Sequence, residues 1–268
     1  TISGFPTILH GFAAAALTLD RSEWPPLEHE ALERTLANYT NYTEGRWTQL
    51  GIGMWNMRFA LYGRKTVVEK QREIVEAALG AIPGAKIAFT TYQTPVDRPD
   101  VPIQDQVRAG IPKIDDMLAM LDIWKGRGRG GHVSFSPVTP FNGHTADTVY
   151  RRIWDRTAAN GLEPVYSIIV RERSLIHVAM SMFDTGDAKR VNDAYRVTRE
   201  LIDDVAEMGY LEYRAHSNVA DLIREKFDFN DHALTRFYRT LKDGLDPNGI
   251  LSPGKQGVWS PVNATVAP

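Results

Sequence analysis

The chain has 268 residues, of which 43% are hydrophobic, and its 31 basic and 33 acidic side chains give a formal net charge of −2. This length can bury one large core or two modest ones, and the balanced charge argues against a surface built for nucleic acid or anionic membrane. The lack of cysteine excludes disulfides and thiol catalysis, and no apolar run reaches the roughly 18 residues of a membrane span, so we expect a cytoplasmic protein.

The first elements predicted along the chain are a strand, a helix and a second strand. The aromatic and apolar run at 55–63 ends in glycine and is typical of a strand, and 65–82 places its apolar residues on one helical stripe. Pro83 and Gly84 end that helix, and 85–93 is predicted to form the next strand. Four prolines in 94–112 indicate an irregular surface loop.

The same alternation returns in the second half of the chain. We predict a strand at 132–138, a helix at 145–160, a hairpin formed by 165–170 and 175–183, and a long helix at 187–208. Strands and amphipathic helices in this order predict an α+β fold, with an antiparallel sheet flanked by helices on one face.

The last sixty residues differ in character from the rest. A strand-like LEYRAHS is followed by two predicted short helices and by the turn-rich DPNGILSPGKQGVW. This tail has too little apolar periodicity to fold alone, so we expect it to dock on another unit. Lys255, in the second of its turns, is placed to approach a cofactor, although a rigid packed terminus explains the same residues.

The segment GRGRGGHVSFSPV begins with a glycine-rich, basic loop. Its glycines, Gly130 and Gly131 among them, let backbone N–H groups approach a ligand closely, and Arg127 and Arg129 add positive charge. Such a loop can bind phosphate or pyrophosphate. Neither a Walker motif nor a G-x-G-x-x-G sequence after a strand is present, and a flexible basic loop is the competing interpretation.

Two further side-chain sets carry chemistry. His132 starts the strand after that loop, where a neutral imidazole nitrogen is a nucleophile that can hold a covalent cofactor; an ordinary edge-strand histidine is the alternative. Tyr213 and Arg214 can together bind a phenolate or carboxylate. Neighbouring strand residues face opposite ways, so both reach one ligand only where the backbone bends. No histidine or carboxylate cluster predicts a metal site.

Taken together, GGHVSFSPV, the hairpin ending in MFD, GYLEYRAHS and DPNGILSPGKQGVW resemble the vanillyl-alcohol oxidase / p-cresol methylhydroxylase family, in particular its eugenol oxidase and 4-alkylphenol oxidase branch. The resemblance implies covalent FAD attached through His132 and a phenolate bound by Tyr213 and Arg214, with Arg214 also near the flavin. It further implies a substrate cavity lined by Ser136, Ser167 and Ile169. One departure is Ile176, which replaces the first histidine of a pair and leaves His177 alone.

The resemblance also implies a division of the chain and a missing part. Residues 1–209 correspond to a substrate or cap domain, N-terminally incomplete, and 210–268 to the return segment of an FAD-binding domain whose N-terminal half is absent. The implied reaction moves hydride from the benzylic or allylic carbon of a para-substituted phenol (a 4-alkylphenol, vanillyl alcohol or eugenol) to flavin N5 through a quinone methide, as in aromatic compound catabolism. O₂ or a cytochrome would accept the electrons, and a homodimer or larger assembly is expected.

Two other functions are compatible with the same residues. A flavin-dependent hydroxy-acid dehydrogenase of the same superfamily would use Arg214 to hold a carboxylate, although the neighbouring Tyr213 favours a phenol. A non-catalytic assembly module would use the basic glycine loop on phosphates or RNA, against which the near-neutral charge argues.

Overall fold

A computed structural model of the chain describes residues 7–10, 55–92, 101, 105–112 and 129–263. The strands in these ranges are β1 (Thr7–His10), β2 (Trp55–Arg58), β3 (Gly130–Phe135), β4 (Pro137–Pro140), β5 (Glu163–Val170), β6 (Ser174–Asp184) and β7 (Leu211–Glu212). The α-helices are α3 (Lys65–Gly80), α5 (Gly143–Ala159), α6 (Ala188–Glu207), α7 (Ala220–Glu225) and α8 (Phe229–Leu245), with short 3₁₀ turns η6 (Ser217–Val219), η7 (Lys255–Gly257) and η8 (Pro261–Asn263). None of the described helices combines the length and apolar character needed to cross a membrane.

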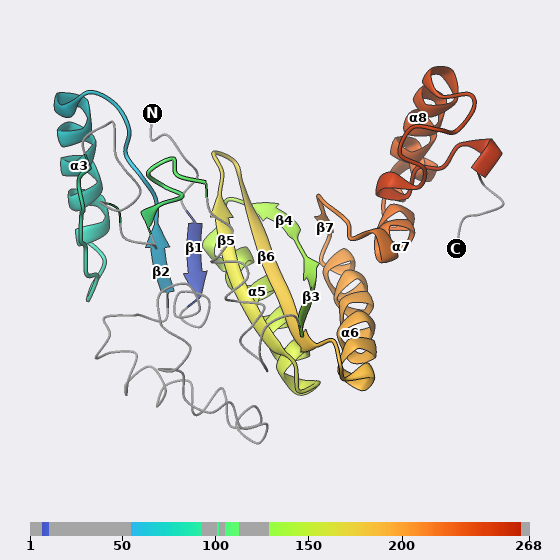
Figure 1. The fold of residues 1–268 in the computed structure, drawn as a ribbon, viewed down its shortest axis with the longest axis horizontal. Helices are drawn as coiled ribbons and strands as arrows, with labels where there is room; N and C mark the ends of the chain where they lie inside the picture. Colours follow the sequence, from blue (N-terminus) through green and yellow to red (C-terminus); the bar gives the residue numbers. More distant parts are fainter. Residues whose placement is uncertain (1–6, 11–54, 93–100, 102–104, 113–128, 264–268) are drawn as a thin grey trace.

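The strands form one antiparallel sheet in the order β2-β1-β5-β6-β4-β7 (Figure 1). The long hairpin β5–β6 is its centre, with Tyr166 opposite Ala179. Strand β3 pairs with the C-terminal half of β6. The chain then continues into β4, which pairs with the N-terminal end of β6. The predicted antiparallel sheet with helices on one face is confirmed.

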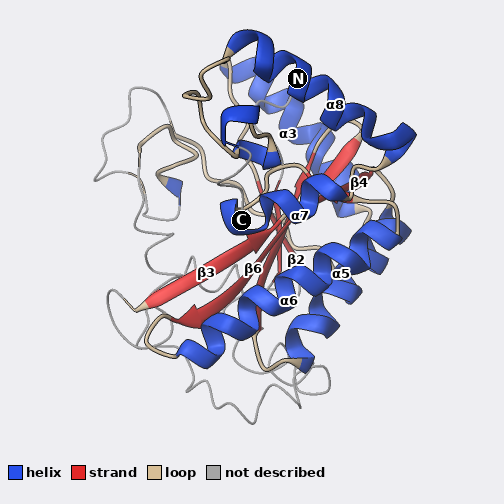
Figure 2. Ribbon diagram, turned by 90° about the vertical axis from the view of Figure 1, so that its right-hand side faces the viewer, coloured by secondary structure: helices blue, strands red, loops and turns tan. Residues whose placement is uncertain are grey.

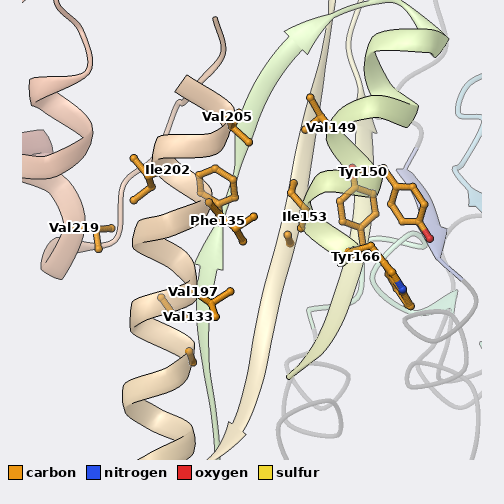
Figure 3. Close-up of a cluster of buried hydrophobic side chains, with 14 of the residues drawn as sticks. Val133, Phe135, Val149, Tyr150, Ile153, Tyr166, Val197, Ile202, Val205 and Val219 are labelled. Atoms are coloured by element: carbon orange, nitrogen blue, oxygen red, sulfur yellow. The ribbon is translucent and has the colours of Figure 1, made fainter. Parts of the chain in front are cut away.

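Helices α5 and α6 cover the same face of this sheet (Figure 2). Their apolar stripes meet the strands in a core that includes Val149 and Ile153 of α5 and Val197 and Ile202 of α6 (Figure 3). All four side chains are at most 2% exposed. Where the two helices pass each other, they are joined by a pair of hydrogen bonds from the Arg156 guanidinium to the Asp204 carboxylate, at 2.8 and 2.9 Å.

Side chains alternate between the two faces of the sheet, and residues directly opposite each other in an antiparallel pair share a face. Val133 and Phe135 of β3, Tyr166 and Ile168 of β5, and Leu175, Ala179 and Phe183 of β6 all belong to the helix-covered core. The residues between them point to the other face, called the far face below. The far face therefore carries His132 of β3 and Ser167 and Ile169 of β5.

Most predicted elements are present with shifted ends, but one is wrong. The helices predicted at 65–82, 145–160 and 187–208 are α3, α5 and α6. The strand predicted at 85–93 is absent: residues 85–92 have no strand pairing, and residue 93 lies outside the described residues. An apolar run becomes a strand only where a neighbouring strand completes its hydrogen bonds, and none of the described strands pairs with this one.

The tail folds as a separate small cluster beside the β7 end of the sheet, and α8 and the C-terminal turns project beyond α7 (Figure 1). The second of the predicted short helices is the 17-residue α8. Turn η7 is fastened to α7, since the Arg224 guanidinium donates to the Gln256 carbonyl at 2.9 Å and the Trp259 indole donates to Asp221 at 2.7 Å. Contact with α7 thus supplies the order that the tail's own sequence does not predict.

Candidate functional site

His132 is the third residue of β3 and lies on the far face of the sheet. Its side chain is half-buried, opposite Met182 of β6. Burial lowers the pKa of His132 below its usual value, and the nearby His216 lowers it further. The imidazole is therefore neutral at neutral pH, which is the form that has a nucleophilic nitrogen.

The start of β3 is held by an ion pair of Arg129, a residue for which the sequence suggests phosphate binding. The Arg129 guanidinium donates two hydrogen bonds, at 2.8 and 3.0 Å, to the buried Asp184 carboxylate at the end of β6. Part of the Arg129 guanidinium is thus engaged within the fold. Its contact with a phosphate stays a prediction, and Arg127 lies outside the described residues. This Arg129–Asp184 clamp joins the start of β3 to the end of β6.

The two glycines before His132 differ in their surroundings. At Gly131 a Cβ atom would lie 2.5 Å from the Phe183 ring, so close packing across β3 and β6 itself requires glycine there. Gly130 pairs with Asp184, directly beside the Arg129 clamp. Both lie within two residues of His132, and their contact with a cofactor stays a prediction.

Tyr213 and Arg214 lie at a bend in the backbone, which is the condition under which both side chains can reach one ligand. Strand β7 ends at Glu212, and the backbone bends at the next two residues. As a result the Arg214 guanidinium lies over the Tyr213 ring, 5.7 Å from its centroid. Both side chains are exposed, and within the described residues neither the phenol hydroxyl nor the guanidinium makes a hydrogen bond or ion pair. The two groups are free to bind one anionic ligand together.

The predicted cavity residues are spread over neighbouring strands. The Tyr213 backbone N–H donates to the Ser136 carbonyl at 3.4 Å, which places the Tyr-Arg bend beside the junction of β3 and β4. Ser167 and Ile169 lie on the same far face, opposite Val178 and Ile176 of β6. Ser136 is buried, whereas Ser167 and Ile169 are half-buried. Lys255 is exposed in the tail on η7.

His177 does not belong to this face. It is fully buried among the core residues under α5, where its Nδ1 contacts the Tyr166 hydroxyl and its Nε2 lies 2.9 Å from the Thr139 hydroxyl. A neutral imidazole offers one donor and one acceptor, so it satisfies both neighbours without a charge. Burial lowers the pKa of His177 to about 4. This histidine organises the core, and the far-face position beside it is occupied by Ile176.

We expect His177 to make the protein labile to acid. Its folded pKa lies below the unfolded value, so between pH 6.5 and 4 the unfolded chain takes up a proton that the folded chain refuses. Stability should fall over that window by roughly 2–4 kcal/mol from this group. In urea melts at several pH values, the His177→Gln variant should be less stable at pH 7 but lose less on acidification. Parallel curves for wild type and variant would contradict the assignment.

Two side chains that sequence reasoning missed flank the Tyr-Arg bend. Glu212 is 4% exposed, and its Oε1 accepts the Ser136 N–H at 3.1 Å. Burial raises the pKa of Glu212 to about 8, although the hydrogen bond from Ser136 and the charge of Arg214 act in the opposite direction. Gln256 in η7 accepts the Ala215 N–H through its side-chain oxygen at 3.3 Å. The sequence around Glu212 contains no signal that this glutamate is buried.

Comparison with known proteins identifies the family. The family described as FAD linked oxidases, C-terminal domain, matches residues 119–256, about half of the chain, including β3, β7 and the Tyr-Arg bend. The chain belongs to this family. It is 25% identical over 211 residues to the 4-cresol dehydrogenase [hydroxylating] flavoprotein subunit of Pseudomonas putida, covering 78% of this chain and 38% of that protein.

Solved structures support the same relationship. The 4-ethylphenol oxidase from Gulosibacter chungangensis, solved with isoeugenol, superposes with a TM-score of 0.78 at 30% identity, over 97% of this chain and 48% of that one. p-Cresol methylhydroxylase superposes with a TM-score of 0.75 at 21% identity, over 95% and 47% of the two chains, and shows a shared fold. The predicted resemblance is confirmed, and the chain spans half or less of the length of these relatives.

Proposed function

We propose that this chain is the C-terminal half of an FAD-dependent oxidase of para-substituted phenols. The observation that carries the proposal is the bend after β7, which places the Arg214 guanidinium over the Tyr213 ring, 5.7 Å from its centroid, and leaves both side chains without a hydrogen bond or ion pair to other described residues. A phenolate oxygen needs such a pair, because it accepts hydrogen bonds and carries negative charge. Relatives whose names specify 4-cresol and 4-ethylphenol support this choice of substrate.

The proposed enzyme is completed by a unit that binds FAD. Residues 1–209 form the substrate or cap domain, and 210–268 return to complete the FAD-binding domain. Helix α8 and the following turn expose large apolar side chains to solvent, with Phe229 85%, Leu245 77% and Ile250 73% exposed. Apolar exposure on this scale is typical of a surface that packs against another unit. We propose that this unit is the N-terminal FAD-binding half and that activity requires it.

Bound FAD would accept a hydride from the substrate. His132 fits the role of its covalent tether, because its neutral imidazole faces the same side of the sheet as the proposed cavity. Gly130, Gly131 and Lys255 are proposed as further contacts to the cofactor. The covalent link would keep FAD from dissociating, and by the family resemblance it would raise the oxidising power of the flavin.

Arg214 and Tyr213 would bind the substrate with its hydroxyl deprotonated. Electron release from the phenolate makes the benzylic or allylic carbon a better hydride donor, and charge stabilisation at that oxygen is therefore the main contribution of these residues. Loss of hydride from that carbon leaves a quinone methide, to which water adds. Ser136, Ser167 and Ile169 would line the space around the ring. We propose O₂ or a cytochrome as the electron acceptor and an assembly of two or more copies.

Anaerobic reduction of the complete, flavin-loaded enzyme tests the proposed function. 4-Ethylphenol should bleach the flavin absorbance, whereas its methyl ether, which cannot ionise, and lactate should leave it unchanged. Bleaching by lactate and not by the phenol would favour the hydroxy-acid dehydrogenase. Retention of the colour with every para-substituted phenol tried would contradict the proposal. Oxygen consumption after readmission of air reports whether O₂ accepts the electrons.

A further inference from the structure

The segment proposed to bind the phenolate receives little support from the sheet. Strand β7 has two residues, and beyond it only the hydrogen bond from the Tyr213 N–H to Ser136 continues the pairing with β4. The Tyr213 and Arg214 side chains are exposed and make no hydrogen bonds to other described residues. The position of this bend must therefore be set by contacts of the residues before and after it.

The contact before the bend is made by Glu212. Its side chain is buried against β4, and Oε1 accepts the N–H of Ser136, the residue whose carbonyl accepts the Tyr213 N–H. The Glu212 side chain and the Tyr213 backbone thus hydrogen-bond to the N–H and the carbonyl of Ser136, respectively. The second oxygen, Oε2, is buried and has no hydrogen-bond partner among the described residues. Burial of this polar atom costs free energy, so Glu212 does not owe its place in the fold to that oxygen.

The contact after the bend is made by Gln256, from a part of the chain about forty residues away. Its side-chain oxygen accepts the Ala215 N–H, and its carbonyl accepts the Arg224 Nε–H. Gln256 has a left-handed backbone with φ of 56°, which costs a residue with a Cβ about 1 kcal/mol. The neighbouring Gly257 has no room for a Cβ, because Arg224 and the Ala220 carbonyl lie against it. The turn is locked in a strained shape that directs the Gln256 amide at Ala215.

We propose that Glu212 and Gln256 are positioning residues, which hold the Tyr213–Arg214 bend from both sides in the geometry that binds the phenolate. Neither touches the ligand. The proposal rests on the proposed function. It connects the C-terminal tail to the substrate site through the side-chain amide of Gln256. Loss of either contact should weaken phenol binding while leaving the chemical step of bound substrate nearly unchanged.

The decisive variant is Gln256→Gly in the complete, flavin-loaded enzyme. Glycine relieves the left-handed strain and removes the contact with Ala215, so substrate binding should weaken while the stability of the fold is kept. We expect the KM for 4-ethylphenol to rise on the order of tenfold, as for loss of one hydrogen bond, with kcat within about twofold and with an unchanged or higher Tm. Gln256→Glu keeps an acceptor oxygen and should restore the KM.

The matched variants at the other contact are Glu212→Gln, which keeps an oxygen for the Ser136 N–H, and Glu212→Ala, which does not. The first should retain the wild-type KM and the second should raise it. Asn248→Ala, in an exposed turn of the same tail, is the control. A KM within twofold of wild type in Gln256→Gly overturns the proposal. This test holds even if Glu212→Ala fails to fold.

Hydrogen exchange separates this proposal from the proposed function. The amide of Ala215 should exchange faster in Gln256→Gly than in wild type, whatever the substrate is. Unchanged exchange there overturns the positioning role. Flavin that no phenol reduces in the wild-type enzyme overturns the proposed function instead.

Discussion

Replacing Arg214 by alanine should reduce kcat/KM for 4-ethylphenol by about 10²- to 10³-fold, the range typical for loss of one charge-stabilising group at a reacting centre. The guanidinium makes no ion pair within the described residues, and its removal only raises the pKa of the buried Glu212 further, so folding should be preserved. Arg214 lies over the Tyr213 ring, and both side chains are proposed to contact the same phenolate oxygen. Rapid-mixing measurement of flavin reduction gives the rate directly.

Two further variants sharpen this expectation. Arg214→Lys keeps the charge but loses the planar fork of donors, so it should recover only part of the rate. Arg173→Ala, in the exposed β5–β6 turn, should behave as wild type. Equal rates for Arg214→Ala and wild type, with both proteins folded and flavin-loaded, would show that Arg214 does not hold the phenolate.

Replacing His132 by alanine should release the flavin on acid precipitation, whereas wild-type protein should retain a yellow pellet. The neutral, half-buried imidazole on the far face is the nucleophile of the proposed tether, and alanine cannot form the bond. The intact mass of the variant should be lower by the mass of FAD in addition to the change of side chain. Turnover should fall about tenfold, equivalent to roughly 1.4 kcal/mol of barrier, because the link is proposed to raise the oxidising power of the flavin.

His144→Ala, an exposed histidine on α5, is the matched control for the tether. Its pellet should stay yellow. Flavin that remains attached to denatured His132→Ala protein would place the tether on another residue and remove His132 from the site.

Local patterns predicted the helices and the central hairpin well, because each carries its own signal. The apolar stripe of α6 recurs with a helical period, and the turn between β5 and β6 separates two alternating runs. Strand β1 was not predicted at all. Its four residues are strand because β2 and β5 lie on either side of them, and no local pattern records such neighbours. The missing strand at 85–93 is the opposite case, since a suitable pattern found no partner.

The candidate site shows the same limit more sharply. The chemistry of His132, Tyr213 and Arg214 was visible in the residue types, and the family resemblance selected them. The sequence does not predict the bend that lets Tyr213 and Arg214 meet, because alternation along a strand would direct their side chains to opposite faces. Glu212 and Gln256 were missed, since burial of one carboxylate and the left-handed turn at one glutamine depend on β4 and α7, which are far away in sequence.

The separation of the two sheet faces has a consequence for how such a protein can diversify. Along β3 and β5, the residues that build the helix-covered core alternate with those that face the proposed cavity. A substitution at Ser167 or Ile169 can therefore change the shape offered to a ligand while the neighbouring Tyr166 and Ile168 keep the core intact. Selection can act on the two sets of positions almost independently. A single-residue insertion in either strand, in contrast, would exchange the two sets and destroy both at once.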